Sequence, residues 1–267
     1  MSDTPPSTPA PVVLVERKDH VAMVTLNRPE KLNALNKAMW IGVRDAFREI
    51  SADDSVRCVL FTGAGERAFC PGADISEFES ARADAAQARD YGHLMDETMG
   101  AIADCPHPVV VMIKGICVGG GLELASMADL RICQESSRFG VPINKLGLTM
   151  GYKEIAALIG LVGKTNALEI LYEARVFGAA EAKEKGLVNR VVPDDKIEEE
   201  GWACVTRIVD GAPLVNRWHK KFARRLEQPA PLTQADYDEG YDSFDTQDFQ
   251  TGYKAFLAKR KPVFEGR

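Results

Sequence analysis

Histidine is scarce in this 267-residue chain, which holds four histidines and six cysteines. The histidines form no HExxH motif and pair with no cysteine, and no two cysteines have CxxC spacing. Zinc and thiol–disulfide sites usually need such spacings, so the sequence predicts no metal site. It predicts buried free thiols instead, and a nucleophilic role for a cysteine is the weaker interpretation. The six are Cys58, Cys70, Cys105, Cys117, Cys133 and Cys204.

Long hydrophobic runs and an excess of positive charge are missing too. No apolar run approaches the roughly 20 residues that cross a bilayer, and residues 1–11 are polar and proline-rich, unlike a signal peptide. The 33 Lys and Arg against 39 Asp and Glu give a net charge of −6, which does not attract nucleic acid. We therefore expect a cytoplasmic protein with no membrane partner, no nucleic-acid partner and a disordered tail over residues 1–11.

Several widespread motifs are incomplete. Residues 160–165 imitate the end of a phosphate-binding P-loop, but Leu158 stands where the motif needs a glycine, and a helix-like segment precedes it. Gly119–Gly121 fails the GxGxxG pattern because Leu124 occupies the last glycine position. No GxSxG nucleophile elbow occurs. Nucleotide-binding and α/β-hydrolase functions are therefore disfavoured.

Strand-like and helix-like segments alternate along most of the chain, after which helical, charged sequence runs to about residue 261. We expect an α/β core over residues 12–200 and a C-terminal helical region over residues 201–267. The expected strands are residues 12–15, 21–26, 56–62, 109–113, 130–133, 138–141 and 187–192. The expected helices before the tail are residues 36–50, 76–103, 122–128, 153–159, 165–173, 179–185 and 195–211.

Two glycine-bearing loops each follow a strongly apolar, strand-like run. Residues 69–74 follow the first run and residues 119–123 follow the second. Glycine in such turns lets bare backbone N–H groups approach a ligand closely. Two turns from separate strands can converge on one developing negative charge, which is how an oxyanion hole is built.

These loops and further segments together resemble the crotonase superfamily, that is, the enoyl-CoA hydratase/isomerase family. The resemblance implies a spiral of ββα repeats, a C-terminal helical trimerisation region, and assembly as a trimer or a dimer of trimers. It also implies an acyl-CoA thioester as substrate, a place in fatty acid metabolism, and no separate cofactor, since coenzyme A is part of the substrate. The resemblance extends from about residue 12 to residue 264. The segments that carry it are residues 26–35, 69–74, 115–125, 139–142, 177–188 and 252–261.

The resemblance also assigns site residues. By position, the N–H groups of Ala73 and Gly120 are the oxyanion donors, and Glu123 is the acid/base group. Phe256 and Lys259 match positions that reach coenzyme A bound to a neighbouring subunit. The full set of implied substrate-binding residues is Lys31, Leu32, Ala34, Gly72, Asp74, Ile75, Gly119, Ile143, Phe256 and Lys259.

One position departs from the family pattern. A hydratase of this family uses two glutamates to hold and split water, and Ile143 stands where the second would follow Pro142. Isoleucine can neither carry nor orient a proton. The candidates for a compensating polar group are Tyr91, His93, Asp96, Asn144, Lys145 and Tyr152.

Three functions stay open at this point. The first is enolate chemistry on an acyl-CoA with Glu123 as its single acid/base, giving double-bond isomerisation or hydration. The second keeps the fold and oxyanion hole for decarboxylation or thioester hydrolysis. The third is a catalytically weak acyl-CoA-binding subunit.

Overall fold

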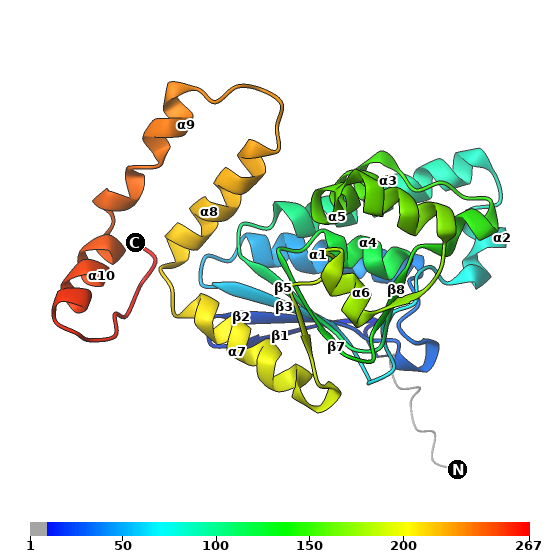
Figure 1. The fold of residues 1–267 in the computed structure, drawn as a ribbon, viewed down its shortest axis with the longest axis horizontal. Coiled ribbons are helices and arrows are strands. Elements are labelled where there is room, and N and C mark those ends of the chain that lie inside the picture. The colour runs from blue at the N-terminus through cyan, green and yellow to red at the C-terminus, as the bar shows by residue number, and fades with distance from the viewer. Residues whose placement is uncertain (1–9) are drawn as a thin grey trace, which may run out of the picture.

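Two β-sheets form the framework of residues 10–267, which the computed structural model describes (Figure 1). Most of the predicted disordered tail, residues 1–9, lies outside this range. The larger sheet has the order β1-β2-β3-β5-β7-β10, and all its neighbouring strands are parallel except β1 and β2. Its strands are β1 (Val13–Lys18), β2 (Val21–Leu26), β3 (Cys58–Gly63), β5 (Val109–Ile113), β7 (Leu130–Gln134) and β10 (Arg190–Val192).

The smaller sheet is formed by the strands that alternate along the chain with those of the larger sheet. Its order is β4-β6-β8-β9, with the first three strands parallel. Along the chain, β3, β5 and β7 join the larger sheet, and the strand after each joins the smaller one, before a helix follows. This repeat is the predicted ββα spiral, which confirms the α/β fold class. The strands are β4 (Ala68–Cys70), β6 (Ile116–Val118), β8 (Arg138–Gly140) and β9 (Phe177–Gly178).

The larger sheet is buried on both faces, as parallel sheets usually are. Alternate side chains of β5 point to opposite sides: Val109 and Val111 join one core cluster, and Val110 and Met112 join the other. Helix α7 (Ile197–Val209) covers the second face. Figure 1 shows α7 below the sheet and α1, α3, α4 and α5 above it.

Helix α1 (Lys37–Ser51) shows how the covering helices are specified. The side chain of Asn36 accepts a hydrogen bond from the N–H of Met39, which caps the helix start. Met39, Val43, Phe47 and Ile50 recur at helical spacing and are buried, as the sequence predicts.

The prediction of a single helix over residues 76–103 is wrong in one respect, because the structure divides this segment. A 3₁₀ turn (Ile75–Glu77) leads into α2 (Phe78–Ala81), and α3 (Ala85–Asp104) starts anew. The carboxylate of Asp84 accepts hydrogen bonds from the N–H groups of Ala86 and Gln87. These bonds favour a helix start at this point over continuation from α2.

Helix α5 (Tyr152–Glu173) joins the two helices predicted over residues 153–159 and 165–173. Gly163, with φ +75°, breaks the helical backbone inside it. Among the helices within residues 10–267, α5 alone is long and apolar enough to cross a membrane. Core helices of soluble proteins meet the same criterion, so this is weak evidence for a membrane span.

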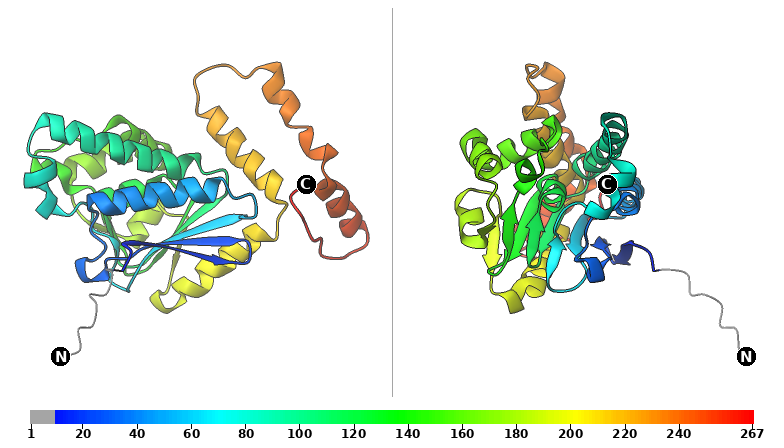
Figure 2. Two further views of the ribbon diagram at one scale, coloured as in Figure 1. Left: turned by 180° about the vertical axis from the view of Figure 1, so that it is seen from behind. Right: turned by 90° about the vertical axis from the view of Figure 1, so that its right-hand side faces the viewer.

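The C-terminal helices extend away from the core (Figure 2). The predicted boundary at residue 200/201 falls inside α7, which packs on the sheet, whereas the protruding part starts with α8. Its end returns to the core, where the side chain of Arg57 donates a hydrogen bond to the Phe264 carbonyl at 2.8 Å. The remaining α-helices are α4 (Gly120–Ser126), α6 (Ala179–Glu184), α8 (Pro213–Leu226), α9 (Gln234–Glu239) and α10 (Gln247–Leu257).

Candidate active site

The two glycine loops meet because β4 and β6 are parallel neighbours, so their C-terminal ends lie side by side. A Cβ atom on Gly72 would lie 3.4 Å from the amide nitrogen of Gly120 and 3.2 Å from the carbonyl oxygen of Val118. Gly72 has φ +107° and Gly119 has φ +52°, conformations that favour glycine. The close approach thus depends on glycine in both loops.

Each loop contributes one backbone amide without an acceptor. Leu35 donates its N–H to Gly72 and accepts from the N–H of Asp74, both at 2.8 Å, so the N–H of Ala73 between them faces the other way. Gly120 is the first residue of α4, where an N–H has no acceptor within the helix. Within residues 10–267, neither the Ala73 nor the Gly120 N–H makes a hydrogen bond. Both residues line one cavity of about 210 Å³.

Glu123 reaches this cavity from α4. Its side chain is 7% exposed, and no hydrogen bond or ion pair to it occurs in the described part of the chain. A Cβ atom on Gly120 would lie 3.7 Å from its Oε2 atom, so the carboxyl group is beside the second glycine loop. Burial, with a smaller contribution from the charge of Glu154, raises the pKa of Glu123 to about 7, and the charge of Arg82 opposes the shift.

Glu154, which the sequence analysis did not select, lines the same cavity from the first turn of α5. It is 8% exposed, and burial raises its pKa. Its carboxylate folds back toward Gly151, where a Cβ atom would lie 2.4 Å from Oε2. A glutamate in the first turn of a helix is common, so the sequence alone carries no signal that singles this one out.

Ile143 also lines the cavity, from the 3₁₀ helix Pro142–Leu146, as the resemblance implies. The side chain of Asn144 turns away to donate to the carbonyls of Leu171 and Tyr172, both at 3.0 Å. Lys145 is exposed, and Tyr152 is 96% exposed.

The candidates on α3 do not reach the cavity either. His93 and Asp96 are exposed. Tyr91 is buried, but its hydroxyl group donates to Glu77 at 3.2 Å and its ring packs under the guanidinium of Arg82. None of the six residues considered as substitutes for a second glutamate lines the cavity; Glu154 does.

The remaining residues implied near the coenzyme A entrance lie on the segment before α1. The side chain of Arg28 donates to the Ala34 carbonyl at 2.7 Å and pairs with Asp74 at 3.0 Å, which ties this segment to the first glycine loop. Lys31 is exposed, and Leu32 is half-buried with φ +54°.

Of the implied substrate-binding residues, Gly72, Ile75, Gly119 and Ile143 line the cavity, as do the proposed catalytic residues. Phe256 and Lys259 lie at the other end of the molecule. Phe256 is 82% exposed on α10, which Figures 1 and 2 place at the opposite end from α2.

Buried asparagine and tryptophan side chains complete the site, and sequence reasoning missed both. The Asn33 side chain donates to the carbonyls of Ala64 and Ala68 and accepts from the N–H of Arg28, which fixes the segment before α1. Trp40 lines the cavity, and its buried Nε1–H has no acceptor within residues 10–267. Asn33 lies within the segment 26–35 that carries the resemblance, which could have pointed to it, whereas Trp40 belongs to none of the motifs.

The cysteines are free and buried, as predicted. Burial raises the pKa of the Cys70 thiol to about 12 and raises that of Cys117 strongly. A thiol that stays protonated is a poor nucleophile, so cysteine chemistry at the glycine loops is disfavoured. No cluster that could hold a metal occurs in the described part of the chain.

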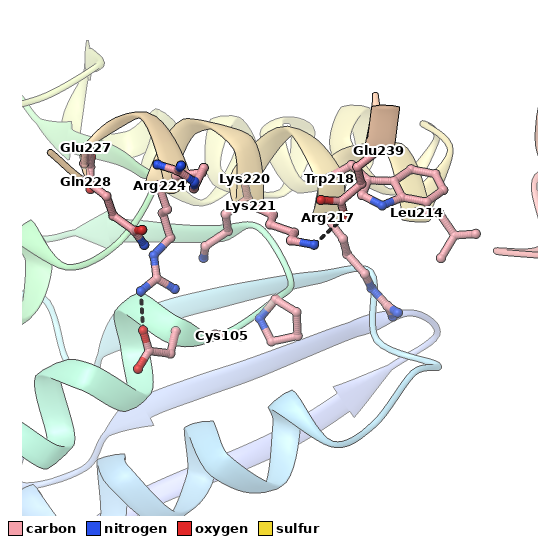
Figure 3. Close-up of a pocket in the computed structure, with 13 residues that line it drawn as sticks. Cys105, Leu214, Arg217, Trp218, Lys220, Lys221, Arg224, Glu227, Gln228 and Glu239 are labelled. Carbon is pink, nitrogen blue, oxygen red and sulfur yellow. Dashed lines mark hydrogen bonds and ion pairs between the residues drawn. The ribbon is translucent and has the colours of Figure 1, made fainter. Parts of the chain in front are cut away.

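A larger groove, of about 690 Å³, lies between α8 and the core (Figure 3). Its cations hold α8 in place: Lys220 pairs with Asp129 at 2.8 Å, and Arg224 pairs with Asp104. Among the described residues that line it, the groove brings no free backbone amide together with a buried carboxyl group. Acid/base chemistry is therefore better supported at the smaller cavity.

The chain is similar to a known family and to named proteins over nearly its whole length. The model of the enoyl-CoA hydratase/isomerase family matches residues 16–267. The crotonyl-CoA hydratase of Syntrophomonas wolfei is 34% identical over 258 residues, which cover 94% of this chain and 97% of the relative. The short-chain-enoyl-CoA hydratase of Clostridium acetobutylicum is 34% identical over 251 residues, covering 93% and 95%.

Solved structures give the same result for the fold. An enoyl-CoA hydratase/carnitine racemase from Magnetospirillum magneticum is 50% identical with a TM-score of 0.95, and 96% of each chain is covered. The enoyl-CoA hydratase from Bacillus anthracis is 31% identical with a TM-score of 0.90, covering 96% of this chain and all of that one.

Proposed function

Because the chain belongs to the enoyl-CoA hydratase/isomerase family, we propose that it moves protons on an acyl-CoA thioester through an enolate intermediate. The N–H groups of Ala73 and Gly120 hold the enolate oxygen, and Glu123 transfers the proton. One observation carries this proposal: two backbone amides without acceptors and a buried, unpaired carboxyl group line one cavity.

The amides supply electrostatic stabilisation. When a proton leaves the carbon beside a thioester, negative charge develops on the carbonyl oxygen. Fixed N–H groups stabilise this charge without reorganising, and removal of one such donor typically costs about 10²–10³ in rate. The glycines let the thioester approach both donors.

Glu123 supplies the proton transfer. An acid/base group works best when its pKa lies near the operating pH, and burial raises the pKa of Glu123 to about 7. Isomerisation of a 3-enoyl-CoA needs one proton removed from C2 and one returned at C4. Hydration of a 2-enoyl-CoA, the reaction for which the Syntrophomonas and Clostridium relatives are named, adds water across the double bond.

The reaction is tested by incubating the protein with crotonyl-CoA and, separately, with a 3-enoyl-CoA, and following products by mass. A gain of one water from crotonyl-CoA identifies hydration. Conversion of the 3-enoyl-CoA to its 2-enoyl isomer identifies isomerisation. Loss of carbon dioxide from a carboxylated acyl-CoA, or release of free coenzyme A, would support decarboxylation or thioester hydrolysis instead. Turnover unchanged in Glu123→Gln would remove Glu123 from the chemistry, and thioester binding without any turnover would favour a binding subunit.

We further propose self-association as a trimer or a dimer of trimers, through the helices that extend from the core. Their surface carries exposed apolar side chains, which often mark interaction sites. In such an assembly Phe256 and Lys259 would contact coenzyme A bound to a neighbouring subunit, with no further cofactor, in the cytoplasm. The large exposed side chains in this region are Leu226, Tyr237, Tyr241, Phe244, Phe249, Tyr253, Phe256, Leu257 and Val263.

A further inference from the structure

We propose that Glu154 is the second carboxyl group of this active site and works with Glu123 across the cavity, compensating for the isoleucine at position 143. The inference rests on the proposed function, because it assigns a second proton-transferring group to the same reaction. Glu154 comes from α5 and Glu123 from α4, so the two carboxyl groups approach the cavity from different helices.

Burial and the lack of an ion pair among the described residues distinguish Glu154 from a typical surface glutamate. It is 8% exposed, and no ion pair to it occurs within the described residues. The charged groups that affect it are Lys153 on the same helix and Asp96 on α3, while Arg82 acts on Glu123. Burial raises the pKa of both carboxyl groups, and the charge of Glu154 adds to the shift at Glu123.

Two carboxyl groups that interact in a cavity share protons. Burial raises the pKa of both groups, and the charge of Glu154 adds to the shift at Glu123, so an arrangement with one group protonated and the other ionised is favoured over one with both ionised. One group is then ready to give a proton and the other to accept one, a division of labour that a single carboxyl group cannot provide at one moment.

Each reaction balances with this pair. In hydration, the Glu154 carboxylate takes a proton from water as the water oxygen bonds to C3, and the double-bond electrons move onto the thioester oxygen. The enolate then collapses and C2 takes the proton of Glu123. In isomerisation, Glu154 removes the C2 proton and Glu123 protonates C4. Proton exchange with solvent restores the starting state.

Gly151 provides the space for this carboxylate. A Cβ atom there would lie 2.4 Å from Oε2 and 3.2 Å from Oε1 of Glu154. The backbone of Gly151, at φ −71° and ψ 168°, suits any residue, so alanine would displace the carboxylate without straining the main chain. Gly151→Ala therefore displaces the Glu154 carboxylate without removing it from the protein.

The test compares Glu154→Gln and Gly151→Ala with wild type on whichever enoyl-CoA is turned over, measuring kcat/KM from pH 5 to 9. We expect a bell-shaped wild-type profile and a loss of about 100-fold in Glu154→Gln, whose residual rate follows one titration only. Gly151→Ala should lose at least about tenfold. Glu173→Gln is the matched control, an exposed carboxylate at the far end of α5 paired with Arg175, and it should leave kcat/KM unchanged.

Thermal denaturation separates this role from a structural one at the start of α5. If Glu154 were only structural, Glu154→Gln would lower the melting temperature and leave the shape of the pH profile unaltered. That result would overturn the inference. So would activity within threefold of wild type in both variants. If Glu154→Gln does not fold, the Gly151→Ala profile decides. Loss of activity in Glu123→Gln with a fully active Glu154→Gln would leave the proposed function standing alone, whereas a wild-type protein that turns over no thioester would overturn both proposals.

Discussion

At the scale of single residues, the buried carboxyl group of Glu123 lowers the stability of the folded protein. It is buried, and no cation in the described part of the chain pairs with it, so its ionised form is disfavoured in the folded protein. Its pKa is about 7 when folded, against an ordinary value of 4.5. Active sites often carry such a penalty, because the burial that shifts a pKa for catalysis also lowers the stability of the folded protein.

This penalty gives a pH-dependent prediction. Below about pH 4.5 Glu123 is protonated in both states and costs nothing; as pH rises toward 7 the unfolded chain ionises first, so the folded state loses stability. The full difference corresponds to about 3 kcal/mol. Glu123→Gln should therefore gain about 2.5 kcal/mol over wild type at pH 8 relative to pH 5, where part of the cost is already present, as measured by urea unfolding. Equal pH dependence of the two proteins would contradict the assignment.

At the scale of elements, the site depends on how tightly the two glycine loops pack. A Cβ atom on Gly121 would lie 2.3 Å from the carbonyl oxygen of Cys70, which joins the start of α4 to the end of β4. Gly115, just before β6, is held as closely, because its Cβ would lie 2.0 Å from the Arg67 carbonyl. Glycine therefore sets the distance between the elements that carry the two free amides.

A single methyl group at this contact should separate the loops. Gly121→Ala forces α4 away from β4, so we expect a loss of roughly 1–3 kcal/mol in unfolding free energy and of at least about tenfold in kcat. Gly160→Ala is the matched control in α5, since its Cβ would meet no atom within 4 Å. That variant should be neutral or gain up to about 1 kcal/mol. A fully active Gly121→Ala protein would show that the amide positions are not critical.

At the scale of the whole molecule, α10, which carries Phe256, lies at the opposite end from α2, whose Phe78 lines the cavity (Figures 1 and 2). The proposed contacts of Phe256 and Lys259 with coenzyme A would therefore be made across a subunit interface. Helices α9 and α10 also carry exposed apolar side chains, and such side chains favour association between subunits in this region.

Assembly and substrate affinity should therefore change together. Light scattering is expected to give a mass three or six times that of the chain. Phe256→Ala combined with Lys259→Ala should raise KM for the thioester about tenfold with little effect on kcat, because the proposed contacts are with coenzyme A and not with the reacting carbons. Lys254→Ala, on the same helix, is the control and should leave KM unchanged. A monomeric protein with full activity would refute the shared site.

Much of the fold could be read from local patterns. The buried strands around residues 59–63 and 109–113, the cap of α1 at Asn36 and the two glycine loops all depend on neighbours in the chain. The break between α2 and α3 was missed because helical composition continues through it, and only the capping bonds of Asp84 divide the segment.

For the site, the sequence by itself determined the two loops, the position of Glu123 and the isoleucine at position 143, since each lies within a motif of a few residues. Only the tertiary structure decided which second carboxyl group lines the cavity with Glu123. Glu154 lies 31 residues further along the chain on another helix, and no local pattern distinguishes it from a solvated glutamate. Its chemistry follows from burial in a shared cavity, and burial is a property of the folded chain, because the neighbours that exclude water come from distant segments.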